Sequence, residues 1–423
     1  MTLGSRPTGS VSVDVAIVGA GPYGLSLAAH LGACGVEHRI FGEPMGAWKA
    51  NMPPGMLLKS YPWATNLSDA ESASTIKKFC AERAQPYHDE LTPLPIERFL
   101  EYAEAFRALH APHVERKLLA TLQPGPDGFH ARFSDGETIV ARRVVVAVGL
   151  QAFRRLPQEA AQLPVEMRSH SGDYGPLDAL DGKEVVVVGS GSSATDLAAM
   201  LSERGVSVSL VARAAHLDFA ARPRTRTLLE RTAAPTSGIG QGWTIGACAR
   251  YPQLIRLLPE DRRVQIANGK AWGPVGSAFA RDRVVGKVPL WLGRNLRKIG
   301  TQGDQVVLDL TDQVGASHAL RCDHVIFATG YSIDANRLDF LDHKILSQMR
   351  LVEKSPTLSS QYETSVPGLH FIGPAAANSF GPVCRFVYGA QHAARQLARH
   401  LSGEIRRHPT PTNVQPHYSP VIP

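Results

Sequence analysis

Two glycine-rich runs are the residues of this 423-residue sequence whose types and spacing are best suited to a chemical role. The first, Gly19-Ala20-Gly21-Pro22-Tyr23-Gly24, follows the apolar run 13–18 and precedes a helical stretch that begins at Leu25. In this pattern the first glycine permits a tight turn, the second lets the backbone approach a pyrophosphate, and the third lets helix and strand pack closely. Free N–H groups and the helix dipole stabilise the anion there. The run therefore predicts a dinucleotide site.

The second run repeats this pattern later in the chain. Gly189-Ser190-Gly191-Ser192-Ser193-Ala194 lies between a strand expected at 184–188 and a helix expected from Thr195, with alanine in the third small position. One such run alone can be an ordinary glycine-containing turn. Two runs in the same strand–turn–helix context predict two dinucleotide-binding units.

The two units differ where the ribose of a dinucleotide is read. Glu43 lies 19 residues after Gly24, and Arg213 lies 19 residues after Ala194. A carboxylate near this offset accepts hydrogen bonds from ribose hydroxyls, whereas an arginine can bind a 2′-phosphate. We therefore expect FAD in the first unit and NADPH in the second. Glu43 is a displaced candidate, because the usual acidic position falls on Gly42. Arg213 has an alternative interpretation as a solvated residue at the end of a strand.

The elements that must position these residues alternate between short apolar strands and helices, which is typical of α/β folds. Further strands are expected at 38–41, 143–149, 206–211, 325–331 and 369–373, hairpins at 129–140 and 306–322, and a last amphipathic helix from about Arg385 to His400. We expect an α/β fold with two Rossmann-like, doubly wound, three-layer domains, the NADPH domain inserted in the FAD domain. The expected boundaries are 13–160 and 318–405 for the FAD domain, 161–317 for the NADPH domain, and flexible ends at 1–12 and 406–423.

The charge of the chain is concentrated in one segment. The formal net charge is +7, and residues 220–300 hold fifteen Lys and Arg against four acids. Basic residues with interleaved tryptophans can bind single-stranded nucleic acid, but no nucleic-acid fold signature accompanies them, so we expect no such partner. A solvated surface is one alternative for the insertion 214–300. The other is a segment that steers an anionic substrate or the phosphates of NADPH.

The cysteines and the chain ends restrict the class of protein further. The five cysteines form no C-x-x-C motif and lack the spacing of metal ligands. The sequence therefore excludes a disulfide scaffold and predicts no metal site. No stretch reads as a signal peptide or a membrane span. The sequence thus predicts a cytoplasmic protein without a membrane partner, and leaves monomer or homodimer open.

The chain resembles the class B flavin-dependent monooxygenases, a group that includes flavin-containing, N-hydroxylating and Baeyer–Villiger monooxygenases. The resemblance rests on both glycine-rich runs, on Trp48 after Gly46, on His170-Ser171-Gly172-Asp173-Tyr174, and on Ala328-Thr329-Gly330-Tyr331. It implies an FAD enzyme that takes hydride from NADPH, reacts with O₂ through a C4a-(hydro)peroxyflavin, and inserts one oxygen atom into a small organic substrate.

The resemblance also implies roles for single residues. Asn66 would donate a hydrogen bond to the flavin peroxide, unless it is only a turn or helix-cap residue. Lys59 and Ser60 would contact the flavin or its phosphates, unless they are a plain strand end. The remaining cofactor contacts are expected at Pro22, Tyr23, Trp48, Gly149, Thr329, Gly330, Tyr331, Gly373, Phe380 and Gly381.

Two other functions remain open from the sequence. One is an NADPH-dependent flavin reductase or oxidase without oxygen insertion, for which the lack of C-x-x-C removes the dithiol version. The other is a non-enzymatic FAD- and NADPH-binding sensor. The substrate is not specified by the sequence, since amines, sulfides, ketones and small aromatic heterocycles all fit the expected chemistry.

Overall fold

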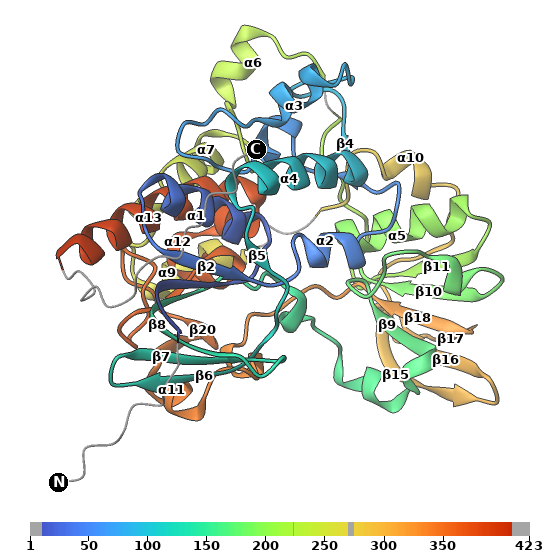
Figure 1. The fold of residues 1–423 in the computed structure, drawn as a ribbon. Helices are drawn as coiled ribbons and strands as arrows, with labels where there is room; N and C mark the ends of the chain where they lie inside the picture. Colours follow the sequence, from blue (N-terminus) through green and yellow to red (C-terminus); the bar gives the residue numbers. More distant parts are fainter. Residues whose placement is uncertain (1–10, 223, 270–274, 408–423) are drawn as a thin grey trace, which may run out of the picture.

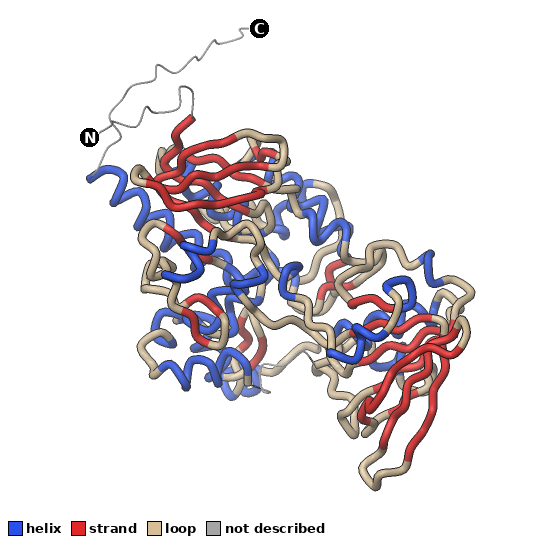
Figure 2. The backbone as a smooth tube through the Cα atoms, turned by 90° about the horizontal axis from the view of Figure 1, so that it is seen from below, coloured by secondary structure: helices blue, strands red, loops and turns tan. Residues whose placement is uncertain are grey.

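The computed structural model describes residues 11–222, 224–269 and 275–407, arranged as two lobes of a mixed α/β fold (Figures 1 and 2). Each lobe contains a sheet of largely parallel strands. The carboxyl ends of neighbouring parallel strands meet at one edge of a sheet, which is where α/β proteins place ligands. The glycine-rich turns lie at these edges.

The first lobe is built on a seven-stranded sheet in the order β5-β2-β1-β8-β7-β6, with β21 also paired to β8. The central strand β1 is parallel to β2 and β8, and Ile17 lies opposite Ile40 and Val145. The strands are β1 (Val11–Val18), β2 (His38–Phe41), β5 (Val114–Glu115), β6 (Leu119–Gly125), β7 (Gly128–Phe133), β8 (Thr138–Val146) and β21 (Leu369–Phe371).

Helices and short hairpins cover this sheet. Helices α1 and α13 lie side by side on it (Figure 1), and their apolar faces join one core. The helices are α1 (Pro22–Ala33), α2 (Gly46–Ala50), α3 (Ile76–Glu82), α4 (Ile96–His110), α11 (His343–Gln348), α12 (Ala377–Phe380) and α13 (Ala390–Arg407). Two small hairpins pair β3 (Leu57–Leu58) with β4 (Leu94–Pro95), and β19 (Leu351–Val352) with β20 (Ser355–Pro356).

The second lobe contains a five-stranded parallel sheet in the order β14-β11-β10-β18-β9. Its elements are β9 (Arg168–His170), β10 (Glu184–Val188), α5 (Ser192–Glu203), β11 (Ser207–Val211), α10 (Arg281–Val284), β14 (Leu290–Trp291) and β18 (His324–Phe327). A three-stranded antiparallel sheet packs beside it, formed by β15 (Asn295–Gln302), β16 (Gln305–Thr311) and β17 (Ser317–Cys322).

The described part of the basic segment between residues 224 and 269 leaves the second sheet and packs on the first lobe (Figure 1), whereas α10 packs on α5 in the second lobe. Its α9 lies against α12, and Ala267 is buried in the core of the first lobe. The Nδ2 group of Asn268 donates to Asn378 Oδ1 at 3.4 Å, and Gln241 Nε2 donates to the Tyr61 hydroxyl at 2.8 Å. The elements of this segment are α6 (Leu228–Ala233), β12 (Thr236–Ser237), β13 (Gly240–Gln241), α7 (Trp243–Arg250), α8 (Pro252–Ile255) and α9 (Glu260–Asn268).

Two pairs of connecting segments join the lobes, and each pair is held by backbone hydrogen bonds. In the first pair, Arg155 N–H donates to Gly330 O at 2.9 Å and Ser332 N–H donates to Phe153 O at 2.8 Å. In the second pair, Ala220 N–H donates to Gly276 O at 2.8 Å, and the Gly276 N–H donates to Asp218 O at 2.7 Å.

Three expectations from the sequence are corrected by these pairings. The expected strand 325–331 ends at Phe327. This strand and the hairpin before it lie in the second lobe, because β18 pairs with β10, so the return to the first lobe comes after Phe327 and not at residue 318. The expected strand 143–149 is Thr138–Val146 in the structure, because the chain runs straight from the hairpin into β8. The last helix begins at Ala390, because residues 382–389 form two 3₁₀ turns.

Other expectations are confirmed or lie outside the structure. The strands at 38–41 and 184–188 have the expected bounds. No helix within the described residues is long and apolar enough to cross a membrane. The expected flexible ends at 1–12 and 406–423 fall almost entirely outside the described residues.

Candidate functional site

The first glycine-rich turn joins β1 to α1 at the end of the sheet. Gly19 has a φ of +115°, and a Cβ there would lie 2.4 Å from the Ala147 carbonyl oxygen. A Cβ on Gly24 would lie 1.9 Å from the carbonyl oxygen of Gly19. Gly21 is different, because a Cβ on it would meet nothing within 4 Å. Packing therefore requires glycine at 19 and 24, while Gly21 borders open space at the start of α1.

The second turn, between β10 and α5, has the same construction. Gly189 has a φ of +152°, and a Cβ on it would lie 2.5 Å from the carbonyl oxygen of Ala328. Its N–H donates to Val211 O at 2.9 Å, as the Gly19 N–H donates to Phe41 O at 2.8 Å. The chain thus builds the same turn twice, once in each lobe.

Both helices that follow these turns begin without a capping side chain. Gly21 and Gly191 occupy the N-cap positions of α1 and α5, and neither first turn contains an acidic residue. By contrast, Thr75 caps α3, and Thr227 with Glu230 forms a capping box on α6. Uncapped N–H groups at a helix start favour an anion such as a pyrophosphate. The residues present therefore fit two dinucleotides.

The structure explains why the acidic residue after β2 is displaced by one position. Gly42 has a φ of +128°, a conformation that disfavours any residue with a Cβ. Glu43 is exposed beyond it and forms long ion pairs with Lys49 at 3.9 Å and Arg116 at 3.6 Å. Arg213 follows β11, is exposed, and makes no ion pair or hydrogen bond with the residues the structure describes. Their ribose contacts stay predictions.

Asn66 ends a 3₁₀ helix and is half-buried beside the start of α3. Its Oδ1 accepts a hydrogen bond from the N–H of Ile76 at 2.8 Å. Only the oxygen of an amide can accept, so this bond fixes the amide orientation and turns the NH₂ group away from α3. That NH₂ group donates to no described residue. Asn66 therefore has a structural role at the start of α3, in line with the alternative that it is a turn or helix-cap residue. Its amide NH₂ group also remains free to donate a hydrogen bond.

The loop after Asn66 is fixed to α1. The Ser68 N–H donates to Ser26 Oγ at 3.0 Å, and His30 Nε2 and Ser68 Oγ are 2.9 Å apart. His30 is buried. Burial, with the nearby charge of Arg395 second, lowers the pKa of His30 to about 4. The loop that carries Asn66 is thus held in place by a neutral histidine.

We expect the free energy of unfolding to fall in mild acid because of His30. Its pKa is lowered in the folded state, so its contribution is complete above the unfolded value of 6.5 and is lost as the pH falls toward 4. Between pH 7 and pH 5, urea titrations should show the wild-type protein losing about 2 kcal/mol more than H30Q. The control is H113Q, at an exposed histidine. Equal pH dependence in the wild-type protein and H30Q would contradict this role.

The His170-to-Tyr174 motif lies where the chain crosses between the lobes. His170 Nδ1 accepts from the N–H of Gly172 at 3.0 Å, and its Nε2 donates to Gly330 O at 3.0 Å. Burial lowers the pKa of His170, so the ring is neutral with both nitrogens occupied. The Tyr331 ring lies 5.1 Å from it, and the Thr329 hydroxyl bonds to Arg155 O. The structure thus shows Thr329, Gly330 and Tyr331 in the crossing. Gly149, at the end of the preceding segment from β8, has a φ of +72°.

Several of the expected cofactor residues make contacts that hold the first lobe together. The Tyr23 hydroxyl is 2.9 Å from the carbonyl oxygens of both Cys384 and Phe386. Phe380 is fully buried and stacks on Tyr362 with ring centroids 4.0 Å apart. The remaining members of this set lie as follows: Gly373 beside the Tyr23 ring, Gly381 against Ile255, and Trp48 on Phe99.

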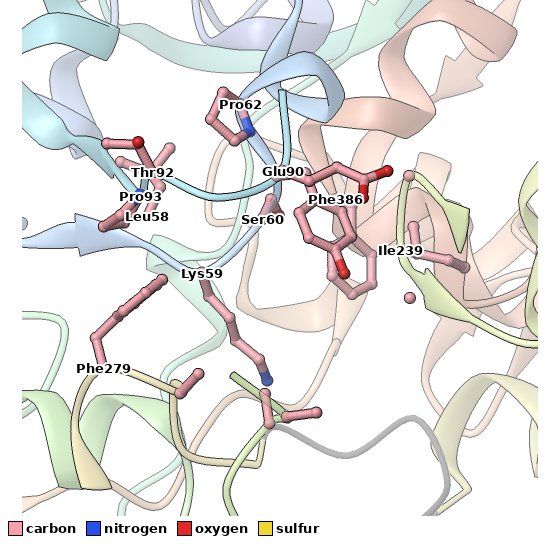
Figure 3. A pocket seen from close by; sticks show the side chains of 16 residues that line it. Leu58, Lys59, Ser60, Pro62, Glu90, Thr92, Pro93, Ile239, Phe279 and Phe386 are labelled. Atoms are coloured by element: carbon pink, nitrogen blue, oxygen red, sulfur yellow. The ribbon is translucent and has the colours of Figure 1, made fainter. Parts of the chain in front are cut away.

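A cavity of about 140 Å³ lies between the first lobe and the basic segment (Figure 3). Lys59 and Ser60 line it, as do apolar side chains from both sides, among them Leu58, Ile239, Phe279 and Phe386. The Lys59 ammonium donates to Val275 O at 2.8 Å, and desolvation lowers its pKa. The carboxylate of Glu90 also lines the cavity. The cavity therefore suits a small and largely apolar molecule.

Asp196 was not among the residues expected at the site. Its carboxylate accepts from Ser192 Oγ at 3.0 Å and from Ser277 Oγ at 2.8 Å. Burial raises its pKa, while these two hydroxyls and the charges of Arg283 and Lys59 oppose the rise. Its position two residues after the second glycine-rich run could have marked Asp196 as a candidate site residue from the sequence. Its contact with Ser277, 81 residues away, was not readable from spacing.

The described residues contain no group of three or more His, Cys, Asp or Glu that could hold a metal ion. The five cysteines are free thiols, and four of them are buried. The site thus offers turns, a cavity and one free amide donor rather than a nucleophile or a metal centre.

Residues 13–239 match the family model described as pyridine nucleotide-disulphide oxidoreductase. This match covers both glycine-rich turns and the first passage of the chain between the lobes. The predicted resemblance to a flavoprotein with nucleotide-binding units is therefore confirmed at the level of the family.

Two curated proteins similar to this chain have names that give different reactions. An indole-3-pyruvate monooxygenase of Oryza sativa subsp. japonica is 30% identical over 204 residues, covering 47% of this chain and 47% of the relative. A ferredoxin–NADP reductase of Leptothrix cholodnii is 28% identical over 219 residues, covering 50% of this chain and 51% of the relative. The chain thus spans about half the length of the curated relatives it matches.

Among solved structures, the reduced form of an ornithine hydroxylase from Pseudomonas aeruginosa superposes with a TM-score of 0.73 at 15% sequence identity. The match covers 93% of this chain and all of that one. At this identity the likeness shows the fold. It extends to 93% of this chain, whereas the family model ends at residue 239.

Proposed function

The chain belongs to the pyridine nucleotide-disulphide oxidoreductase family, and from that premise we propose that it is an NADPH-dependent FAD monooxygenase acting on a small organic substrate. The observation that carries the proposal is the pair of turns with one construction, each opening onto an uncapped helix start. The relatives' monooxygenase names and the confirmed resemblance to class B flavin monooxygenases support the reaction type.

In this proposal the two lobes are two Rossmann-like domains, the second inserted in the first. Gly19, Gly21 and Gly24 hold the pyrophosphate of FAD at the start of α1, and the run from Gly189 to Ser193 does the same for NADPH at α5. Bound FAD supplies the redox chemistry that no side chain of the site offers. The expected route through a C4a-(hydro)peroxyflavin stays a prediction, as do the cytoplasmic location and the oligomeric state.

The chain's own residues bind and orient the substrate, and they exclude water from the cavity. The cavity between the lobe and the basic segment holds the substrate, with Lys59 and Glu90 as its charged lining. Its apolar walls exclude water, which protects an oxygen transfer from side reactions. Asn66 donates a hydrogen bond through the amide NH₂ group that its bond with Ile76 leaves free.

The test uses the flavin-loaded protein and three readouts. NADPH added without oxygen should bleach the flavin absorbance, and a panel of amines, sulfides and ketones is then screened with oxygen admitted. A monooxygenase gives oxygenated product in proportion to NADPH, with little hydrogen peroxide. Hydrogen peroxide in full proportion to NADPH for every compound would identify an oxidase instead, and absence of reduction would identify a sensor.

A flavin reductase is the second candidate, favoured by the reductase relative. The free cysteines include no C-x-x-C, so the electrons of a reductase would have to pass to an external acceptor. Rapid reduction of ferredoxin, without oxygenated product from any compound, would favour this candidate.

Arg213 should determine the choice between NADPH and NADH. Removing its guanidinium takes away a charge-assisted contact with the 2′-phosphate, so R213Q should raise the KM for NADPH about 10- to 100-fold and leave the KM for NADH within about twofold. The matched control is R297Q, which removes an exposed arginine from β15. Steady-state kinetics with both dinucleotides measure this. If R213Q raises the KM for both dinucleotides equally, or changes neither KM, Arg213 is only a solvated strand-end residue.

A further inference from the structure

The most exposed cluster of large apolar side chains lies on α6 and α7, away from the cavity. Leu228 and Leu229 on α6 are 83% and 82% exposed, Trp243 at the start of α7 is 69% exposed, and Tyr251 just after α7 is 53% exposed. The Trp243 indole N–H donates to Thr232 O at 3.1 Å, which joins the two helices. These four residues are called the α6–α7 face below. Soluble proteins rarely expose such a group of large apolar side chains unless the group binds a partner.

The α6–α7 face is one surface rather than four scattered residues. Trp243, Ala247, Arg250 and Tyr251 recur at intervals of four, three and one residues, which places them on one side of α7. Figure 1 shows α6 projecting beyond the rest of the molecule. The two leucines therefore belong to a protruding element, α6.

The charges around the face are positive and partly uncompensated. Between residues 224 and 258 the sequence has five arginines and one acid, Glu230. Glu230 pairs with Arg224, whereas Arg231 and Arg250 make no ion pair with any residue that the structure describes. A second copy of the chain would bring the same positive charge against this face, which opposes self-association. The complementary partner is an extended anionic surface.

We propose that the α6–α7 face binds the protein to the surface of an anionic lipid bilayer. The leucines reach the boundary of the acyl chains, Trp243 and Tyr251 lie at the level of the headgroups, and Arg231 and Arg250 bind lipid phosphates. The binding is peripheral. It replaces the sequence-based expectation that the protein has no membrane partner.

The position of the face gives this binding a structural link to the cavity. The hairpin β12–β13 connects α6 to α7, and its Ile239 and Gly240 line the cavity. The membrane-bound face and the cavity wall are therefore parts of one continuous segment. The inference does not depend on which reaction the cavity serves.

Vesicle flotation with the flavin-loaded full chain tests the proposal. Vesicles of phosphatidylcholine containing phosphatidylglycerol should carry the protein, vesicles of phosphatidylcholine alone should carry much less, and added salt should release it. The variant L228S/L229S/W243S should bind the anionic vesicles at least about tenfold more weakly. The variant R231Q/R250Q should lose about fivefold for each arginine on anionic vesicles only.

The matched control is L109S/V314S, which removes two equally exposed apolar residues elsewhere. The flavin content of every variant should match that of the wild-type protein, because none of these residues lines the cavity or the turns. Unchanged vesicle binding in L228S/L229S/W243S would overturn the proposal. So would wild-type protein that ignores anionic vesicles but forms a dimer that this variant abolishes.

Discussion

Replacing Gly24 with alanine should cost the protein both its folding stability and its flavin. The new Cβ would lie 1.9 Å from the carbonyl oxygen of Gly19, a backbone atom that cannot rotate away. Relief requires α1 to move from β1, and α1 is packed under α13 through the core of the first lobe. We expect a loss of about 3 kcal/mol or more in the free energy of unfolding, and loss of most of the bound FAD.

The variant G21A separates the two effects. A Cβ on Gly21 meets nothing within 4 Å, so the apoprotein should unfold at the same urea concentration as the wild type. It would still occupy the space through which the backbone approaches the pyrophosphate, so FAD binding should weaken. Urea titration of apoproteins and flavin content after purification measure the pair. A stable G24A apoprotein, or G21A with full FAD affinity, would contradict this account of the turn.

Replacing Asn66 with alanine should uncouple NADPH oxidation from product formation. Without the amide NH₂ donor we expect product per NADPH to fall by about 10²-fold, with hydrogen peroxide rising in its place, because one well-placed donor has about this effect on a rate. The Ile76 N–H also loses its acceptor, which should cost about 1 kcal/mol in the free energy of unfolding.

The variant N66D distinguishes the donor from the acceptor. Aspartate keeps an oxygen for the Ile76 N–H and removes the NH₂ group, so N66D should keep the wild-type stability and lose coupling as N66A does. The measurements are oxygenated product, hydrogen peroxide and NADPH in one reaction mixture. Full coupling in N66D with instability only in N66A would leave Asn66 a purely structural residue.

Local patterns in the sequence predicted the glycine-rich turns well. Gly19, Gly24 and Gly189 were expected from spacing alone, and each is required where it stands because a Cβ would meet a backbone oxygen. Such contacts form between a strand, the following turn and the next parallel strand. A short motif with its flanking apolar runs therefore contains nearly all the information.

Long-range packing could not be predicted in the same way. The basic segment was expected to belong with the second sheet that flanks it in sequence, yet Ala267 and Ile239 pack against the first lobe. The contact of Lys59 with Val275 joins residues 216 positions apart. Periodicity shows which face of a helix is apolar but not which surface covers it. The cavity, which depends on that choice, was therefore invisible in the sequence.

The two hydrogen-bonded pairs of connecting segments have a mechanical consequence. We therefore expect the second lobe to rotate about the line that joins these two connections more easily than it slides or twists relative to the first lobe. The basic segment stays with the first lobe during that rotation. Val275, which accepts the Lys59 hydrogen bond, lies beside one of the two pivots. In such a rotation the cavity would lie close to the axis, and the second glycine-rich turn would move with the second lobe.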